Sequence, residues 1–298
     1  MTPPARMGTS PASPTSAGTR RGAPPTPRQV ALSKALPDRV PWETLGPDFF
    51  SAWCYPSGRW QPEHLSIYGP TGSGKSWFEK TVLKERARLR GSHIVIVATK
   101  PADATLTSLG WPVVTSWPPT KQWGDKSKTE QCIFWARAQG LNKEGRARQR
   151  AAIEDLLSKL WKPDSNIIIA FDEIAYLEQE LGLSTEMATY YREARANGIT
   201  IVASTQRPAG VTRYMHSESS WSVFFAPKDE EDAERVAQVA GNKLYYRRCF
   251  AELDRSNHEF LLVHSGTNQA YISSIPKTSG GEDVRPKTEP VSKPSHSV

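Results

Sequence analysis

The chain has little of what would indicate a disulfide-stabilised or metal-binding protein. Only three of its 298 residues are cysteines. Cys54, Cys132 and Cys249 are far apart and odd in number, which excludes a zinc spacing and a disulfide framework. The six histidines show no metal-ligand spacing either. We therefore expect buried thiols in a reducing compartment.

Long apolar runs are also absent. No stretch approaches the roughly 18 consecutive apolar residues of a membrane-spanning helix. The N-terminal segment has Arg and Pro but not the apolar core of a secretory signal. From this we expect a soluble, cytoplasmic protein with no membrane partner.

Both ends of the chain lack apolar periodicity. Residues 1–45 are rich in Pro, Ser, Thr, Gly and Ala, and residues 277–298 have the same character. Such segments cannot bury enough apolar surface to offset the entropy lost on ordering. We predict disordered tails at 1–45 and 277–298 around one folded domain at 46–276. The Pro-rich N-terminal segment could dock on a protein partner.

The net charge of +7 lies mostly in those tails. Residues 1–45 contribute +4 and residues 277–298 contribute +1, which leaves 7 − 4 − 1 = +2 for the domain. A basic composition alone therefore does not establish a nucleic-acid surface.

Within the domain, residues 121–150 carry a net charge of +5. Two interpretations stay open: a solvated helix face, or a surface that contacts the phosphates of DNA. The basic residues of this stretch are Lys121, Lys126, Lys128, Arg137, Lys143, Arg146, Arg148 and Arg150.

One segment carries a complete motif. Residues 69–76 read GPTGSGKS and fit the phosphate-binding loop G-x-x-x-x-G-K-[ST], between a candidate strand and a candidate helix. Its glycines allow backbone N–H groups and the helix N-terminus to face an anion. We predict that Lys75 reaches the β- and γ-phosphates of ATP and that Ser76 holds Mg²⁺. The predicted nucleotide-binding residues are Gly69, Pro70, Thr71, Gly72, Ser73, Gly74, Lys75 and Ser76.

Short β-branched runs alternate with helical stretches, which predicts an α/β fold with a mainly parallel twisted sheet and helices on both faces. The predicted strands are 64–68, 93–99, 113–114, 166–171, 199–204 and 222–226, followed by a hairpin of 260–264 and 269–275. The predicted helices are 76–90, 146–161, 184–196 and 229–240, with Ser184 as an N-cap and Asn197-Gly198 as a C-cap signal. A Trp/Pro-rich and basic insertion is expected at about 101–150.

Two acids follow the apolar segment NIIIAF at 166–171. In a phosphate-loop protein, Asp172 at a strand end is placed to hold Mg²⁺. Glu173 is placed to polarise the attacking water as a general base. The adjacent Glu favours a hydrolysing ATPase over a nucleotide kinase.

The predicted strand 199–204 ends in Ser-Thr-Gln-Arg-Pro. Gln206 could hydrogen-bond the γ-phosphate or the attacking water and sense which nucleotide is bound. The alternative, a polar turn before a proline, stays open at this point.

Three segments together resemble the FtsK/HerA superfamily of ring-forming, DNA-pumping ATPases. They are GPTGSGKS at 69–76, NIIIAFDE at 166–173 and REARANGITIVASTQRP at 192–208. The resemblance covers about residues 64–245. It implies a RecA-like P-loop NTPase fold and self-association into a ring, usually a hexamer, with ATP at the subunit interfaces. A protein of this size also looks like the relatives encoded by viruses or plasmids of bacteria.

The resemblance also implies an arginine that acts on a neighbouring subunit. Arg195 matches it in spacing, eleven residues before Gln206, and Arg192 is the reserve candidate. The chain departs from the family at two places. Ala98-Thr99-Lys100 stands where members often have an acid, and Arg213 is the nearest candidate for a second arginine before the fifth strand.

Two functions follow from these observations. The first is an ATP-hydrolysing, ring-forming motor that translocates duplex DNA without sequence specificity, for genome packaging, transfer or segregation. The second is a nucleotide-switched ATPase that remodels or recruits a protein partner without moving DNA. Stimulation of hydrolysis by DNA distinguishes the two.

Overall fold

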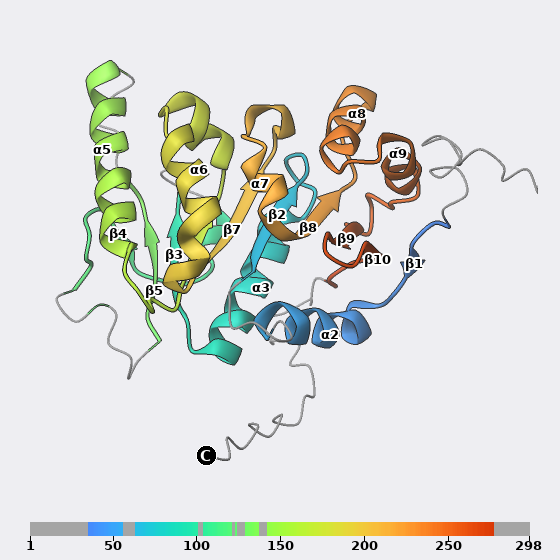
Figure 1. Cartoon of the computed structure of the whole chain (residues 1–298), viewed down its shortest axis with the longest axis horizontal. Helices are drawn as coiled ribbons and strands as arrows, with labels where there is room; N and C mark the ends of the chain where they lie inside the picture. The colour runs from blue at the N-terminus through green and yellow to red at the C-terminus, as the bar shows by residue number, and fades with distance from the viewer. Residues whose placement is uncertain are drawn as a thin grey trace, which may run out of the picture.

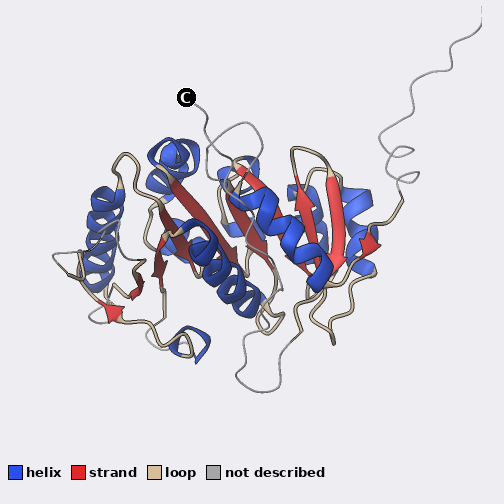
Figure 2. Cartoon of the chain, turned by 90° about the horizontal axis from the view of Figure 1, so that it is seen from below, coloured by secondary structure: helices blue, strands red, loops and turns tan. Residues whose placement is uncertain are grey.

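A twisted sheet with helices on both faces organises the domain (Figures 1 and 2). The computed structural model describes residues 35–55, 63–100, 104–120, 123, 129–136 and 142–276. These residues form one sheet of ten strands. The strands are β1 (Asp38–Arg39), β2 (His64–Tyr68), β3 (His93–Val97), β4 (Val113–Val114), β5 (Gln131–Phe134), β6 (Ile167–Phe171), β7 (Ile199–Thr205), β8 (Ser219–Phe225), β9 (Phe260–His264) and β10 (Gln269–Ser273).

The order of the strands places the sequence motifs side by side. It runs β1-β10-β9-β8-β2-β7-β6-β3-β5-β4. β2 pairs in parallel with both β7 and β8, and β6 lies in parallel between β7 and β3. Only β9 runs antiparallel to its neighbours. The carboxyl ends of β2, β7 and β6 therefore meet at one edge of the sheet.

Helices cover the sheet on two sides. They are α2 (Trp42–Cys54), α3 (Lys75–Arg90), α4 (Ala104–Thr107), α5 (Lys143–Leu160), α6 (Ser184–Glu193), α7 (Tyr214–Ser217), α8 (Glu230–Val239) and α9 (Lys243–Ala251), with a π-helical turn η1 (Tyr176–Glu180) and the 3₁₀ turns η2 (Ala194–Asn197) and η3 (Pro208–Gly210). One apolar core joins the sheet to α5, α6, α8 and α9, and a second joins it to α2, α3 and α4.

The central strands are apolar because both of their faces are covered. Every residue of β2, β3, β6 and β7 is buried. Parallel strands with helices on both sides give nearly continuous apolar runs in sequence. This explains why these strands are visible in the sequence, and the predicted α/β fold class is confirmed.

Several elements differ from the sequence predictions. Helix α2 and helix α9, which follows α8, were outside the predicted set. So was β5, which pairs with β3 in the basic stretch. Ser184 is not an N-cap: Leu183 holds that position, and the Ser184 hydroxyl donates to the Glu178 carbonyl at 3.1 Å. Gly198 does end the following turn, in the left-handed conformation at φ 75°.

The first described elements precede residue 46. β1 pairs in parallel with β10 at the edge of the sheet, and α2 begins at Trp42. Residues 1–34 and 277–298 lie outside the described residues.

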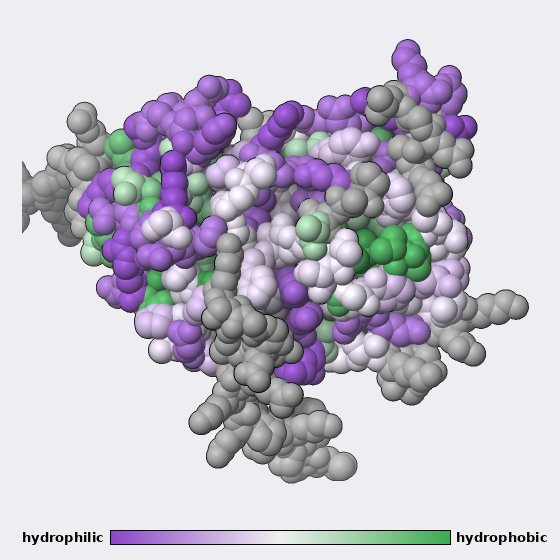
Figure 3. All heavy atoms as spheres, turned by 180° about the vertical axis from the view of Figure 1, so that it is seen from behind, coloured by the Kyte–Doolittle hydropathy of each residue, from purple (hydrophilic) through white to green (hydrophobic). Residues whose placement is uncertain are grey.

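The face seen in Figure 3 is mainly hydrophilic or intermediate in hydropathy, with hydrophobic residues in small separate patches. Among the described residues, the exposed large hydrophobic side chains are far apart in the sequence: Leu36, Tyr55, Val113 and Leu244. No helix in the described ranges is both long enough and apolar enough to cross a membrane.

The three cysteines are free thiols. Cys54, Cys132 and Cys249 are all buried, as expected from their spacing. Burial raises the pKa of the Cys132 thiol to about 12, which keeps it protonated and unreactive.

Candidate functional site

The phosphate loop joins the end of β2 to the start of α3. Gly72 and Gly74 have φ of 80° and 107°, a region that side chains disfavour. Gly69 has a different role, since a Cβ there would lie 2.7 Å from the Phe225 Cβ. The loop can therefore expose its N–H groups only because these positions carry no side chain.

Lys75 is the first residue of α3, and it is buried, with a relative exposure of 7%. Its Nζ donates to the Pro70 carbonyl at 2.9 Å. Burial lowers the pKa of Lys75 to about 8, opposed by the negative charges of Glu173, Glu79 and Asp172. The ammonium group thus lies in a partly desolvated site next to three carboxylates, where an added phosphate would favour its charged form.

Asp172 and Glu173 follow β6 directly. The Thr99 hydroxyl, after neighbouring β3, lies 3.5 Å from Asp172 Oδ2. Both carboxylate oxygens of Glu173 accept hydrogen bonds from the end of β7. Oε1 accepts from the Thr205 hydroxyl at 2.7 Å, and Oε2 accepts from the Gln206 N–H at 3.0 Å.

Gln206 connects these acids to the phosphate loop. The Thr71 hydroxyl donates to Gln206 Oε1 at 2.5 Å, while the Gln206 backbone holds Glu173. The Gly69 N–H also donates to the Thr205 carbonyl at 3.3 Å. One continuous set of contacts therefore joins the loop after β2, the end of β7 and the acids after β6.

The donor set fits a magnesium ion. Ser76 and Asp172 offer a hydroxyl and a carboxylate oxygen, and Mg²⁺ is usually held by one or two protein oxygens together with substrate phosphates. Among the described residues, no group of three or more His, Cys, Asp or Glu side chains could hold a metal by itself. Both observations fit an Mg²⁺ ion that would bind together with the nucleotide phosphates.

The candidate arginines lie elsewhere. Arg195 is in η2, before the start of β7, whereas Gln206 follows the end of that strand. A strand of this length spans about 20 Å, so Arg195 cannot reach the phosphate loop of its own chain. Its guanidinium pairs with Glu218 at 3.6 Å.

The two other arginines share one aromatic ring. The guanidinium of Arg192 lies 5.4 Å from the centre of the Tyr214 ring, and that of Arg213 lies 5.5 Å from it. Arg192, in the last turn of α6, and Arg213, just before α7, therefore lie close to each other.

The basic stretch is only partly described. Lys121, Lys126, Lys128 and Arg137 lie outside the described residues. Lys143, Arg146, Arg148 and Arg150 are on α5.

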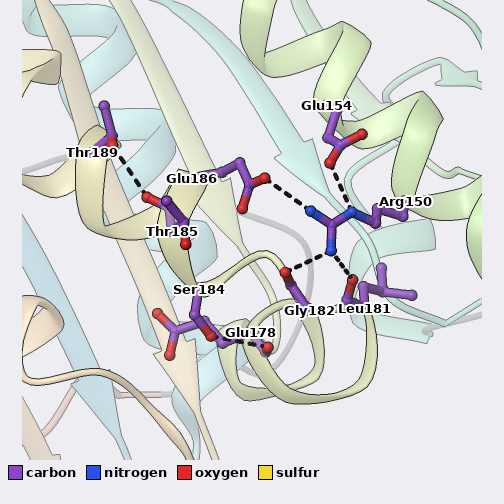
Figure 4. Close-up of polar contacts among 9 residues, drawn as sticks. All are labelled: Arg150, Glu154, Glu178, Leu181, Gly182, Ser184, Thr185, Glu186 and Thr189. Carbon is purple, nitrogen blue, oxygen red and sulfur yellow. Dashed lines mark hydrogen bonds and ion pairs between the residues drawn. The ribbon is translucent and has the colours of Figure 1, made fainter.

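Arg150 holds α5 to the segment before α6 (Figure 4). Its guanidinium pairs with Glu154 at 2.7 Å and Glu186 at 2.9 Å, and donates to the carbonyls of Leu181 and Gly182. Arg146 pairs with Glu180 at 2.9 Å. Both guanidinium groups form ion pairs with acids of the same chain. These ion pairs favour a structural role for the two arginines over contact with DNA phosphates.

A cleft of about 600 Å³ opens beside the phosphate loop. Figure 1 shows this loop in cyan next to α8. The far wall of the cleft carries no sequence motif and was outside the predicted site. The residues that line it are Pro70, Thr71, Gly72, Ser73, Gln206, Arg207, Ala226, Lys228, Asp232, Arg255, His258 and Glu259.

Comparison with solved structures identifies the fold. The genome packaging NTPase B204 from Sulfolobus turreted icosahedral virus 2, in complex with AMPPCP, matches with a TM-score of 0.50 and 14% identity over 70% of this chain and 96% of that one. The DNA-packaging ATPase B204 from Sulfolobus Turreted Icosahedral Virus gives 0.51 and 15% over 70% and 96%. VirB4 of Thermoanaerobacter pseudethanolicus gives 0.55 and 11% over 72% and 90%.

No protein-family model matches the sequence, and no curated protein matches it. The likeness therefore rests on structure, and at these identities it shows the fold. These neighbours are FtsK/HerA-type P-loop ATPases, so the resemblance seen in the three sequence segments is confirmed for the fold.

Proposed function

We propose that this protein is an ATP-hydrolysing, ring-forming motor that translocates duplex DNA. The observation that carries the proposal is the convergence of the phosphate loop, Glu173 and Gln206 at one edge of the sheet. A structural neighbour with this fold was solved with the ATP analogue AMPPCP bound, which supports ATP as the nucleotide.

Each residue of the site has a separate task in hydrolysis. The loop N–H groups and Lys75 bind the triphosphate and neutralise its charge. Mg²⁺, held by Ser76 and Asp172, would supply charge neutralisation at the phosphate oxygens. Glu173 orients the attacking water and accepts its proton on a carboxylate oxygen.

Glu173 is positioned for this task by the end of β7. Both of its oxygens are occupied by Thr205 and Gln206, and Gln206 in turn contacts Thr71 in the phosphate loop. A γ-phosphate that takes over the Gln206 side chain would break the contact with Thr71. Occupancy of the loop and the orientation of Glu173 are thereby coupled.

The position of Arg195 supports the proposed ring. Because it lies at the opposite end of β7 from its own phosphate loop, it can act only on the site of a neighbouring subunit. The pairing with Glu218 would have to give way when Arg195 reaches that site. An arginine supplied in this way accelerates phosphoryl transfer by about 10³–10⁵.

DNA as the substrate is supported by the nature of two neighbours. The B204 proteins are described as genome-packaging and DNA-packaging enzymes. Since Arg146 and Arg150 pair with acids of the same chain, we assign DNA contacts to other basic residues of the domain.

One experiment tests the proposal as a whole. The ATPase rate and the oligomeric state are measured together, with and without long duplex DNA, at low and high salt. A DNA motor hydrolyses ATP faster with DNA and loses this stimulation as salt rises. A rate indifferent to DNA would favour the nucleotide-switched partner-binding ATPase instead.

A further inference from the structure

We propose that the cleft beside the phosphate loop seats the nucleoside of the bound nucleotide, with the His258 ring as the part of its wall that contacts the base. The inference rests on the proposed ATPase function and names the part of the protein that recognises base and ribose. His258 lies outside all three sequence motifs.

The sheet order sets the direction in which the nucleotide lies. Glu173 and Gln206 must lie near the γ-phosphate, and they are on the β7 and β6 side of β2. The nucleoside end of an extended nucleotide then points to the other side of β2, toward β8 and β9. The cleft is found on that side: Ala226 follows β8, and His258 precedes β9.

The size and lining of the cleft suit a nucleoside. Its volume of about 600 Å³ falls within the range of small-molecule sites, about 300–1,000 Å³. Pro70 and Ala226 give apolar surface, and Asp232 adds a carboxylate that can accept hydrogen bonds from hydroxyl or amino groups.

The segment that carries His258 is built as a firm platform. The Asp254 carboxylate accepts from the Ser256 N–H at 2.8 Å, the Ser256 hydroxyl at 2.6 Å and the Asn257 amide at 2.7 Å. The Glu259 carboxylate accepts from the Asp254 N–H at 2.8 Å. Arg255 donates to the carbonyls of Pro227 and Lys228 and so joins this segment to the chain after β8.

His258 itself is fixed against the phosphate loop. Its Nδ1 donates to the Ser73 carbonyl at 3.1 Å, and a Cβ on Gly74 would lie only 3.3 Å from the His258 Cβ. It has a φ of 52°, a left-handed conformation that is unfavourable for a residue other than glycine. Such residues persist where their surroundings hold them, and they concentrate at ligand sites.

The test compares a nucleotide with its phosphate part alone. The affinities of the wild type and of His258→Asn for AMPPCP and for inorganic tripolyphosphate are measured by calorimetry, with Mg²⁺ present. Asn tolerates the left-handed conformation but lacks the imidazole ring. We expect about a tenfold loss of AMPPCP affinity, typical of a lost aromatic contact with a base, and an unchanged affinity for tripolyphosphate.

A second variant and a control separate binding from folding. His258→Gly adopts the same φ without strain and should give the same result as His258→Asn. Asn268→Ala alters another left-handed residue, at φ 54° in the turn between β9 and β10, outside the cleft lining. It should leave both affinities unchanged.

The possible outcomes are distinct. Unchanged AMPPCP affinity in both His258 variants would overturn the nucleoside assignment. An equal loss for AMPPCP and tripolyphosphate would also overturn it, since His258 would then support only the phosphate loop. A wild-type protein that binds neither compound would overturn the proposed ATPase function itself.

Discussion

At the carboxyl end of β7, Thr205 and Gln206 hold Glu173 beside the phosphate loop, whereas at its amino end Arg195 pairs with Glu218 on the surface. The first end completes a site within the chain. The second presents a cation that its own site cannot use. Under the proposed function, the same strand separates what one subunit does alone from what requires a neighbour. Each variant below acts on one end or the other.

Lys75→Ala should have the largest effect, because it removes the cation that neutralises the triphosphate. We expect nucleotide binding to be lost, as measured by calorimetry with AMPPCP. Lys84→Ala, further along the same helix, is the control and should bind normally. If Lys75→Ala bound AMPPCP with wild-type affinity, the phosphate loop would not be the nucleotide-binding part of the site at the carboxyl end of β7.

Glu173→Gln should bind ATP yet turn over at least about 10²-fold more slowly, since the amide cannot accept the proton of the attacking water. Binding and steady-state hydrolysis are measured on the same preparation. Glu180→Gln, in the pair with Arg146, should hydrolyse ATP at the normal rate. Equal rates for Glu173→Gln and the wild type would mean that another group activates the water.

Arg195→Ala should assemble normally and hydrolyse ATP about 10³-fold more slowly, because the neighbouring site loses its arginine. A mixing experiment sharpens the comparison of the two ends. Lys75→Ala subunits still carry Arg195, so a mixture with Arg195→Ala subunits should regain activity that neither variant shows alone. Arg192→Ala, in the preceding helix α6, is the control and should hydrolyse ATP at the normal rate. Absence of any regained activity in verified mixed rings would contradict action between subunits.

Thr205→Val should change turnover without changing nucleotide affinity. It removes the hydroxyl that donates a hydrogen bond to the Glu173 carboxylate. We expect the loss of this bond to a charged group to lower kcat about tenfold. Thr205→Ser restores the hydroxyl and should restore the rate. A change in KM alone, with kcat preserved, would show that Thr205 does not position Glu173.

The smallest expected effect is the uptake of a proton by Lys75 when a triphosphate binds. Burial lowers the pKa of Lys75 to about 8, and a bound triphosphate should raise it. Above pH 8 the Lys75 amine is mostly neutral, so triphosphate binding must add a proton to it, whereas near pH 7 the lysine is already charged. Calorimetry of tripolyphosphate binding in buffers of different ionisation enthalpy should show uptake that increases from pH 7 to pH 9. Uptake that does not vary with pH would place the pKa of Lys75 outside this range.

The sequence predicts the centre of the fold well and its margins poorly. β2, β3, β6 and β7 are apolar runs because helices cover both of their faces, and a run of this kind is visible without any tertiary information. β5 has only four residues and lies in a charged stretch, so the local sequence does not indicate a strand there. It forms a strand because it pairs with β3, which is distant in the sequence.

The candidate site divides in a similar way. Lys75, Asp172 and Glu173 belong to motifs whose spacing carries their chemistry, and the structure brings them together. His258 belongs to no motif and reaches the phosphate loop only through the fold. For Arg150, the sequence left a solvated face and a phosphate contact open. Its partner Glu154 lies one turn along the same helix, but Glu186 becomes a neighbour only when α5 and α6 pack.

The position of β2 also determines when the site can form on the ribosome. β2 pairs with β7 and β8, which are among the last strands of the sheet to be synthesised. A nascent chain therefore has the GPTGSGKS segment early but cannot enclose it until synthesis has passed Phe225. Under the proposed function, ATP can stabilise only a chain that extends past β8, and a translation product that stops before β8 gains no such protection.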